Sequence, residues 1–209
     1  MRKHILTLVG ALALAANVSP AMAADFSDPD WPCVQRKVPH LSVGQMWAGP
    51  PIGEADLSAW RKDDRVAGLA PVLAVRRTAE EQADSLIGEF SETHAEDRNR
   101  ALSLLFAGAF TLIERERSEI ISGIGRYART QTALAAGIDA LQTELAELQA
   151  LAEPNFDQQD RMEELEDKVH WDTRIYKDRQ QSLTYVCETP VILEKRAFAL
   201  ARMIQGRLD

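Results

Sequence analysis

The feature that most constrains the fold is a seven-residue repeat of apolar side chains between residues 106 and 152, a stretch without proline. Such a repeat keeps one stripe of a helix turned toward a partner helix, so it predicts a left-handed coiled coil. Residues 95–152 would form one helix roughly 85 Å long. Gly123 and Gly125 leave open whether that helix is continuous or kinked. The seam consists of Phe106, Phe110, Ile113, Arg117, Ile120, Ile124, Tyr127, Gln131, Leu134, Ile138, Leu141, Leu145, Leu148 and Ala152.

A second apolar stripe with the same period follows directly after Pro154 and Asn155. Asn155 is a favoured helix N-cap residue, and Gln158 three positions later can complete a capping box. A short turn between two long helices makes them antiparallel neighbours, so facing positions have numbers that sum to about 310. The second seam consists of Met162, Leu165, Val169, Asp172, Tyr176, Arg179, Leu183 and Val186.

The polar residues that interrupt the two seams support this register. It places Gln131 opposite Arg179 and Arg117 opposite Glu194. Lone polar residues at core positions of a coiled coil lower stability but fix register. Because these two interruptions find a polar partner, an antiparallel hairpin is the expected arrangement, with Asp172 opposite Ile138 as the exception. The apolar pairs in the same register are Leu148 with Met162, Leu145 with Leu165, and Leu141 with Val169.

The chain is predicted to be all-α from residue 54 onward. Residues 54–123 and 187–209 are expected to form a helical head, and residues 124–186 a coiled-coil stalk. Around residues 101–113 apolar side chains cover most of the helix circumference, which indicates burial on several sides. Two signals predict helix starts: a hydroxyl residue directly before a proline, and a hydroxyl residue three positions before an acid. They are Thr78 with Glu81, Thr93 with Glu96, and Thr189 with Pro190.

Residues 24–53 concentrate prolines and glycines and are predicted to form an irregular, Pro- and Trp-rich arm. Cys33 and Cys187 are the only cysteines of the chain. In an oxidising compartment an even number of cysteines is normally paired, which predicts a disulfide between the arm and the last helix. Closing so long a loop is worth about 4 to 5 kcal/mol in the chain-entropy model.

Residues 1–23 have the pattern of a cleaved secretory signal peptide. Arg2 and Lys3 precede a short apolar stretch, which ends at the small-residue cleavage site Ala21-Met22-Ala23. That stretch is shorter than the roughly 20 residues that span a bilayer, and no later one is long enough. The mature chain is therefore expected in the periplasm, without membrane insertion. Its 32 acidic against 24 basic residues argue against nucleic acid as a partner.

The sequence holds no recognisable catalytic or phosphate-binding motif, and neither a metal nor a cofactor is predicted. His170 shares one helical sector with Glu166 and Asp167, as a metal site requires, but no second His or Cys completes the ligands. Trp and Met are favoured at recognition surfaces. For the tryptophans of the arm the alternative is packing against the head beside the disulfide. The candidate interaction residues are Trp31, Trp47, His170 and Trp171.

These observations favour a non-enzymatic structural or adaptor protein that acts through helical, coiled-coil contacts in the cell envelope. The alternative is a small-ligand or metal-binding helical module with a pocket between its helices. The expected partner is an envelope protein whose identity the sequence does not reveal. A homodimer through the coiled coil is a second arrangement, because pairing of two hairpins would cover flanking residues such as Ala135 and Leu151.

Overall fold

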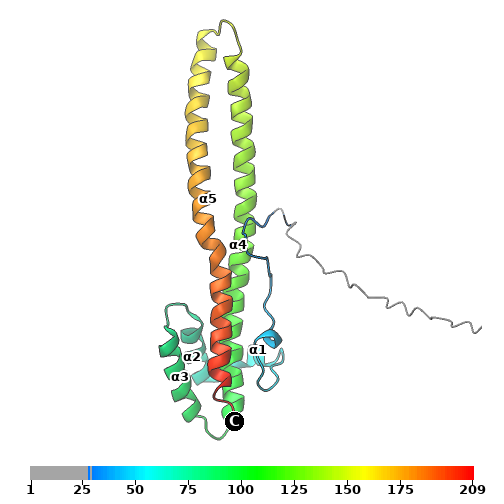
Figure 1. Cartoon of the computed structure of the whole chain (residues 1–209), viewed down its shortest axis with the longest axis vertical. Helices are drawn as coiled ribbons and strands as arrows, with labels where there is room; N and C mark the ends of the chain where they lie inside the picture. The colour runs from blue at the N-terminus through cyan, green and yellow to red at the C-terminus, as the bar shows by residue number, and fades with distance from the viewer. Residues whose placement is uncertain (1–27, 29) are drawn as a thin grey trace, which may run out of the picture.

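The computed structural model describes residue 28 and residues 30–209, so the signal peptide predicted for residues 1–23 lies outside the described part. In the described part every regular element is helical and there is no strand. The long helices α4 (Arg98–Gln149) and α5 (Phe156–Gln205) form an antiparallel hairpin with short helices gathered at one end (Figure 1). The predicted fold, a helical head with a long hairpin, is thus confirmed. The short elements are η1 (Val43–Gln45), α1 (Asp56–Ala59), η2 (Trp60–Lys62), α2 (Asp64–Ala74) and α3 (Glu80–Glu92).

Helix α4 is continuous over 52 residues and passes through Gly123 and Gly125 without a break. It is roughly 78 Å long at 1.5 Å per residue, and α5 is of similar length. Burial changes along α4: most side chains of residues 101–110 are buried, whereas no residue of the helix beyond Ile138 is. The hairpin therefore leaves a densely packed head and extends as a two-helix stalk. Among the described helices, none has a stretch long and apolar enough to cross a membrane.

The turn of the hairpin agrees with the prediction, and the register agrees in part. Asn155 caps α5, and the reciprocal bonds with Gln158 complete the expected capping box. Polar pairs across the hairpin have residue numbers that sum to between 305 and 315, the upper value coming from Gln149 with Glu166. Three others illustrate the register. They are Arg161 with Glu144, with Nε and Oε1 2.8 Å apart, the Tyr127 hydroxyl with the Arg179 carbonyl at 3.2 Å, and Arg117 with Glu194, with Nη2 and Oε2 3.7 Å apart.

The predicted pairing of Gln131 with Arg179 is wrong. Gln131 is buried, but its Nε2 donates to the Tyr176 carbonyl at 3.2 Å, and the Arg179 side chain is exposed. The reason is a phase change in the α5 seam, in which Cys187 rather than Val186 is buried. An α-helix has 3.6 residues per turn, so a strict 3.5-residue seam drifts until one additional residue restores the contact.

The predicted start of a last helix at Thr189 and Pro190 is also wrong, because α5 continues through Pro190 to Gln205. A proline inside a helix removes one hydrogen bond and costs about 3 kcal/mol. Burial on the head side offsets that cost, since the turns that follow Pro190 carry the most deeply buried stripe of α5. That stripe is Leu193, Ala197, Leu200 and Ile204.

Both predicted capping boxes at the start of head helices are wrong for the same physical reason. The Thr78 hydroxyl donates to the Val72 carbonyl at 2.7 Å instead of capping α3, which begins after Ala79 without a side-chain cap. Thr93 ends α3, and its hydroxyl donates to the Phe90 carbonyl. A threonine hydroxyl can donate to a nearby carbonyl as readily as it can accept from an amide N–H. The sequence motif alone therefore did not decide which of the two bonds forms.

The head core is centred on Phe106 of α4, which is fully buried and stacks on Trp47 with ring centroids 4.6 Å apart. Helix α2 approaches α4 closely at Gly108, where an added Cβ would lie 2.9 Å from the Ala70 Cβ and 3.0 Å from the Trp60 ring. Glycine is thus the residue that lets α2 and η2 pack directly on the α4 backbone.

The segment that follows α5 closes the head through an ion pair with α3. Arg207 Nη2 lies 2.9 Å from Asp84 Oδ2, and the hydrogen bond between them holds the pKa of Asp84 below its usual value. The arm joins the opposite end of the head. The predicted Cys33–Cys187 disulfide is present, with Cα atoms 5.6 Å apart.

Candidate interaction surface

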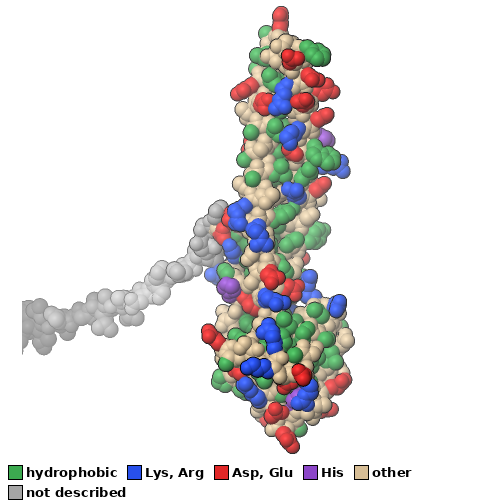
Figure 2. All heavy atoms as spheres, turned by 180° about the vertical axis from the view of Figure 1, so that it is seen from behind, with side chains coloured by type: hydrophobic (Ala, Val, Ile, Leu, Met, Phe, Trp, Pro, Cys, Tyr) green, Lys and Arg blue, Asp and Glu red, His purple; other side chains and the backbone are tan. Residues whose placement is uncertain are grey.

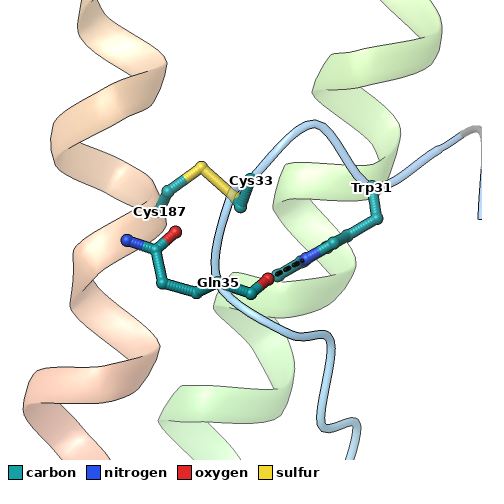
Figure 3. The surroundings of a disulfide bond; sticks show 4 residues. All are labelled: Trp31, Cys33, Gln35 and Cys187. Atoms are coloured by element: carbon teal, nitrogen blue, oxygen red, sulfur yellow. Dashed lines mark hydrogen bonds between the residues drawn. A yellow bond between two sulfur atoms is a disulfide. The ribbon is translucent and has the colours of Figure 1, made fainter. Parts of the chain in front are cut away.

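The tryptophans of the arm pack against the protein itself. Trp47 is buried in the head, and its indole N–H donates to the Pro50 carbonyl at 2.7 Å. Trp31 is half-buried beside the disulfide and donates to the Gln35 carbonyl at 2.6 Å (Figure 3). Both indole donors are therefore satisfied internally, and the packing alternative describes their positions. Trp47 offers a partner little surface.

His170 and Trp171, the other two candidates, lie on the outer side of α5 in the stalk. Trp171 is 60% exposed, and His170 is exposed beside Glu166 in a shallow groove between the helices. In the part of the chain that the structure describes, no group of three His, Cys, Asp or Glu side chains is placed to hold a metal. Of the two residues, Trp171 presents the larger apolar surface.

The structure adds two residues to Trp171 that the sequence analysis missed. Tyr185 is 77% exposed and Ile192 is 43% exposed. They follow Trp171 by two and three heptads, and a straight helix drifts by only about 20° per heptad, so all three lie within a sector of about 60°. We call Trp171, Tyr185 and Ile192 the α5 stripe. Its seven-residue spacing was readable in the sequence, but Asp178 occupies the intervening heptad position and concealed it.

Charged residues accompany the α5 stripe along one edge. Arg174 and Lys177 lie beside its tip-proximal half and Glu188 beside its head-proximal half; all three are exposed. None of them forms an ion pair with another residue of the described chain. Figure 2 shows hydrophobic side chains exposed between charged ones along the hairpin. The surface thus combines an apolar stripe with two bases beside its tip-proximal half and an acid beside its head-proximal half, and Asp178 adds a negative charge within the stripe itself.

The end of the stalk has a different character. Arg161 binds Glu144 and Glu164, and its hydrogen bond holds the pKa of Glu144 below the usual value. Otherwise acidic side chains predominate there, and Phe156 is exposed at the turn. These charges are solvated, so each ion pair contributes little to stability. The acidic residues are Glu147, Glu153, Asp157, Asp160, Glu163, Glu166 and Asp167.

A hollow of about 430 Å³ lies where the arm meets the hairpin beside the disulfide. It occurs at the phase change of the α5 seam, and the small side chains of Ala128 and Ala135 contribute to its wall. Gln131 lines it as well, and its buried Oε1 has no hydrogen-bond partner. The hollow holds no charged group, so it offers no electrostatic preference for a ligand.

Comparison with known proteins found no match: no protein-family model, no curated protein and no solved structure is significantly similar to the chain. The fold alone defines its class, a helical hairpin with a disulfide-tethered arm. A fold of this kind carries no function with it, so function has to be argued from the exposed surface.

Proposed function

We propose that the protein is an exported adaptor of the cell envelope, without enzymatic activity, that binds an amphipathic helix of a partner protein along the α5 stripe. The observation that supports this most directly is the heptad spacing of three large, exposed apolar side chains outside the seam. Isolated exposed apolar residues are ordinary, but a regular stripe of them is what a third helix requires.

The dimensions of the stripe suit a helix. From Trp171 to Ile192 it extends roughly 32 Å at 1.5 Å per residue, which is the length of a helix of about 20 residues. Tyr and Trp are the side chains most often found at binding hot spots. A matching partner helix carries apolar residues at seven-residue spacing, acids facing Arg174 and Lys177, and a base facing Glu188. This order of charges would also set the direction in which the helix binds.

Export is supported by two independent features. The signal-peptide pattern of residues 1–23 directs a chain out of the cytoplasm, and a buried disulfide is typical of proteins that mature in an oxidising compartment. We place the adaptor in the periplasm on these grounds.

Site-specific photocrosslinking in cells tests the proposal. A photoreactive amino acid replaces Tyr185 in one variant and Ala136, an exposed residue of α4, in the control. We expect the Tyr185 variant to yield a discrete adduct whose crosslinked peptide belongs to an amphipathic helix of another envelope protein. The Ala136 variant should yield none.

Three results would contradict the proposal in whole or in part. Adducts that contain only this chain would replace the adaptor with a homodimer built on the same stripe. Equal, heterogeneous adducts at both positions would show that α5 has no preferred partner. Detection of the unprocessed N-terminus in the adduct would refute export.

A further inference from the structure

The head contains a cavity of about 350 Å³ between the α2–α3 loop and α5, away from the seam of the stalk. Its wall is rich in cations: three basic side chains face one acidic side chain, in a chain whose formal net charge is −8. The lining residues are Arg76, Thr78, Ala79, Glu80, Ile192, Lys195 and Arg196. A local excess of positive charge on an acidic protein needs an explanation.

The N-terminus of α3 contributes backbone donors to this wall. Helix α3 has 13 residues, and Ala79 at its N-cap position supplies no side-chain acceptor. The hydroxyl of Thr78, which could have capped the helix, is bound to the Val72 carbonyl. The first amide with a backbone acceptor is that of Ala83, which donates to Ala79. The preceding amides, of Glu80, Glu81 and Gln82, are therefore free as helix N-terminal donors, and Glu80 is the one of these three residues that lines the cavity.

Arg196 provides the independent observation. Its side chain is only 7% exposed, and its Nε donates to the Leu73 carbonyl at 2.9 Å. Its Nη2 is buried and has no hydrogen-bond partner. Burial lowers the pKa of the Arg196 guanidinium, and the negative charge of Glu80 acts against this shift. Within the described chain Arg196 and Glu80 do not form an ion pair. A buried guanidinium with an unused donor is costly unless an acceptor completes it.

We propose that this cavity binds a phosphoryl group, either as free phosphate or as the phosphate of a lipid headgroup. Cations line it from two elements, Arg76 from the α2–α3 loop and Lys195 with Arg196 from α5, and Glu80 at the start of α3 lines it from a third. A tetrahedral phosphoryl group has enough oxygens to engage all three elements, whereas a carboxylate has two. The Glu80 side chain is exposed and acts as the one opposing charge. The site shares Ile192 with the α5 stripe, but its argument does not rest on the proposed adaptor role.

Calorimetric titration of the oxidised, mature protein with inorganic phosphate tests the site. Arg76→Gln and Lys195→Gln should each weaken binding about tenfold, since each removes one charge-assisted contact. Both side chains are exposed, so neither variant should lose its fold. Glu80→Gln should strengthen binding, because it removes the opposing charge. The matched control is Arg179→Gln, which makes the same charge change on the stalk and should leave binding unchanged.

Two further measurements are needed. One distinguishes free phosphate from a lipid headgroup as the source of the phosphoryl group, and the other tests the role of Arg196. Flotation with vesicles of phosphatidylcholine and phosphatidic acid, compared with phosphatidylcholine alone, shows whether a headgroup is bound; loss of flotation in Arg76→Gln would support the same site. Arg196→Lys keeps the charge but removes the planar fork, and should weaken binding with an unchanged circular dichroism spectrum.

The proposal is overturned if neither free phosphate nor the phosphatidic acid vesicles bind. It is also overturned if Arg179→Gln weakens binding as much as Arg76→Gln and Lys195→Gln do, since the effect would then come from net charge alone.

Discussion

Replacement of two glycines of α4 by alanine should have opposite effects on stability, although both lie in the interior of the same helix. Alanine is favoured over glycine in a helix by about 1 kcal/mol. At Gly137 an added Cβ meets no atom within 4 Å, so Gly137→Ala should raise the free energy of unfolding by about that amount. For a chain of this size this corresponds to an increase in Tm of roughly 2 to 4 °C.

At Gly108 the same Cβ would lie 2.9 Å from the Ala70 Cβ and 3.0 Å from the Trp60 ring. Ala70 has no rotatable side chain, so relief requires a shift of α2, and overpacking of this kind costs about 1 to 3 kcal/mol. Gly108→Ala should therefore unfold more easily than Gly137→Ala by about 1 to 3 kcal/mol. Thermal unfolding followed by circular dichroism measures the difference.

Gly123→Ala is the matched control for the pair, because its closest neighbour would be the flexible end of Arg126 at 3.8 Å. It should resemble Gly137→Ala. If Gly108→Ala instead gained as much stability as the other two variants, α2 and η2 would not pack directly on the α4 backbone at Gly108.

Three other predictions concern the disulfide, the register and acid stability. Serine at both Cys33 and Cys187 should lower the free energy of unfolding by about 2 to 5 kcal/mol. It should also speed proteolysis of residues 30–40, with little change in helical signal. If the arm of this variant resisted proteolysis as well as that of the oxidised protein, packing alone would hold it. In that serine background, cysteines placed at Leu141 and Val169 should form a disulfide crosslink. Cysteines at Leu141 and Tyr176 should not, because these positions are offset by about 10 Å along the helix axis. Equal crosslinking yields for the two pairs would indicate a slipping coil. The lowered pKa of Asp84 means that its ion pair stabilises the folded state above the usual Asp pKa and is lost as the pH falls through the folded value. Asp84→Asn should therefore flatten the loss of stability in urea titrations below about pH 4, whereas an unchanged slope would exclude this ion pair as a contributor.

The hairpin was predictable because its periodicity is long and its turn has a defined cap. Two heptad seams and Asn155 with Gln158 were enough to fix the antiparallel register. The error at Gln131 arose where the 3.6-residue helix left the 3.5-residue repeat, a drift that a seam of few residues does not reveal. The head was less predictable, because its helix starts depend on tertiary contacts. The Thr78 hydroxyl could either accept from an amide of α3 or donate to a carbonyl, and in the folded head it donates to Val72.

The candidate surfaces divide in the same way. The α5 stripe follows from a seven-residue spacing that the sequence contains, but exposure was needed to distinguish it from a core face. Arg196 also left a signal, since it interrupts the apolar stripe between Leu193 and Ala197. Its neighbours Arg76, from the α2–α3 loop, and Glu80, at the start of α3, are more than 100 residues away in the chain, and only the folded head brings them together.

The disulfide also determines how the molecule would respond to mechanical load. It joins residues 154 positions apart, so a force applied between the two ends of the chain passes from Cys33 directly to Cys187. Helices α1 to α4 and the tip of the hairpin then lie outside the stretched path and bear no tension. Reduction would release roughly 500 Å of additional contour length at about 3.5 Å per residue. In an oxidised copy held at both ends, the stalk and helices α1 to α4 would thus carry no load, and within the head only the part of α5 that follows Cys187 would be pulled.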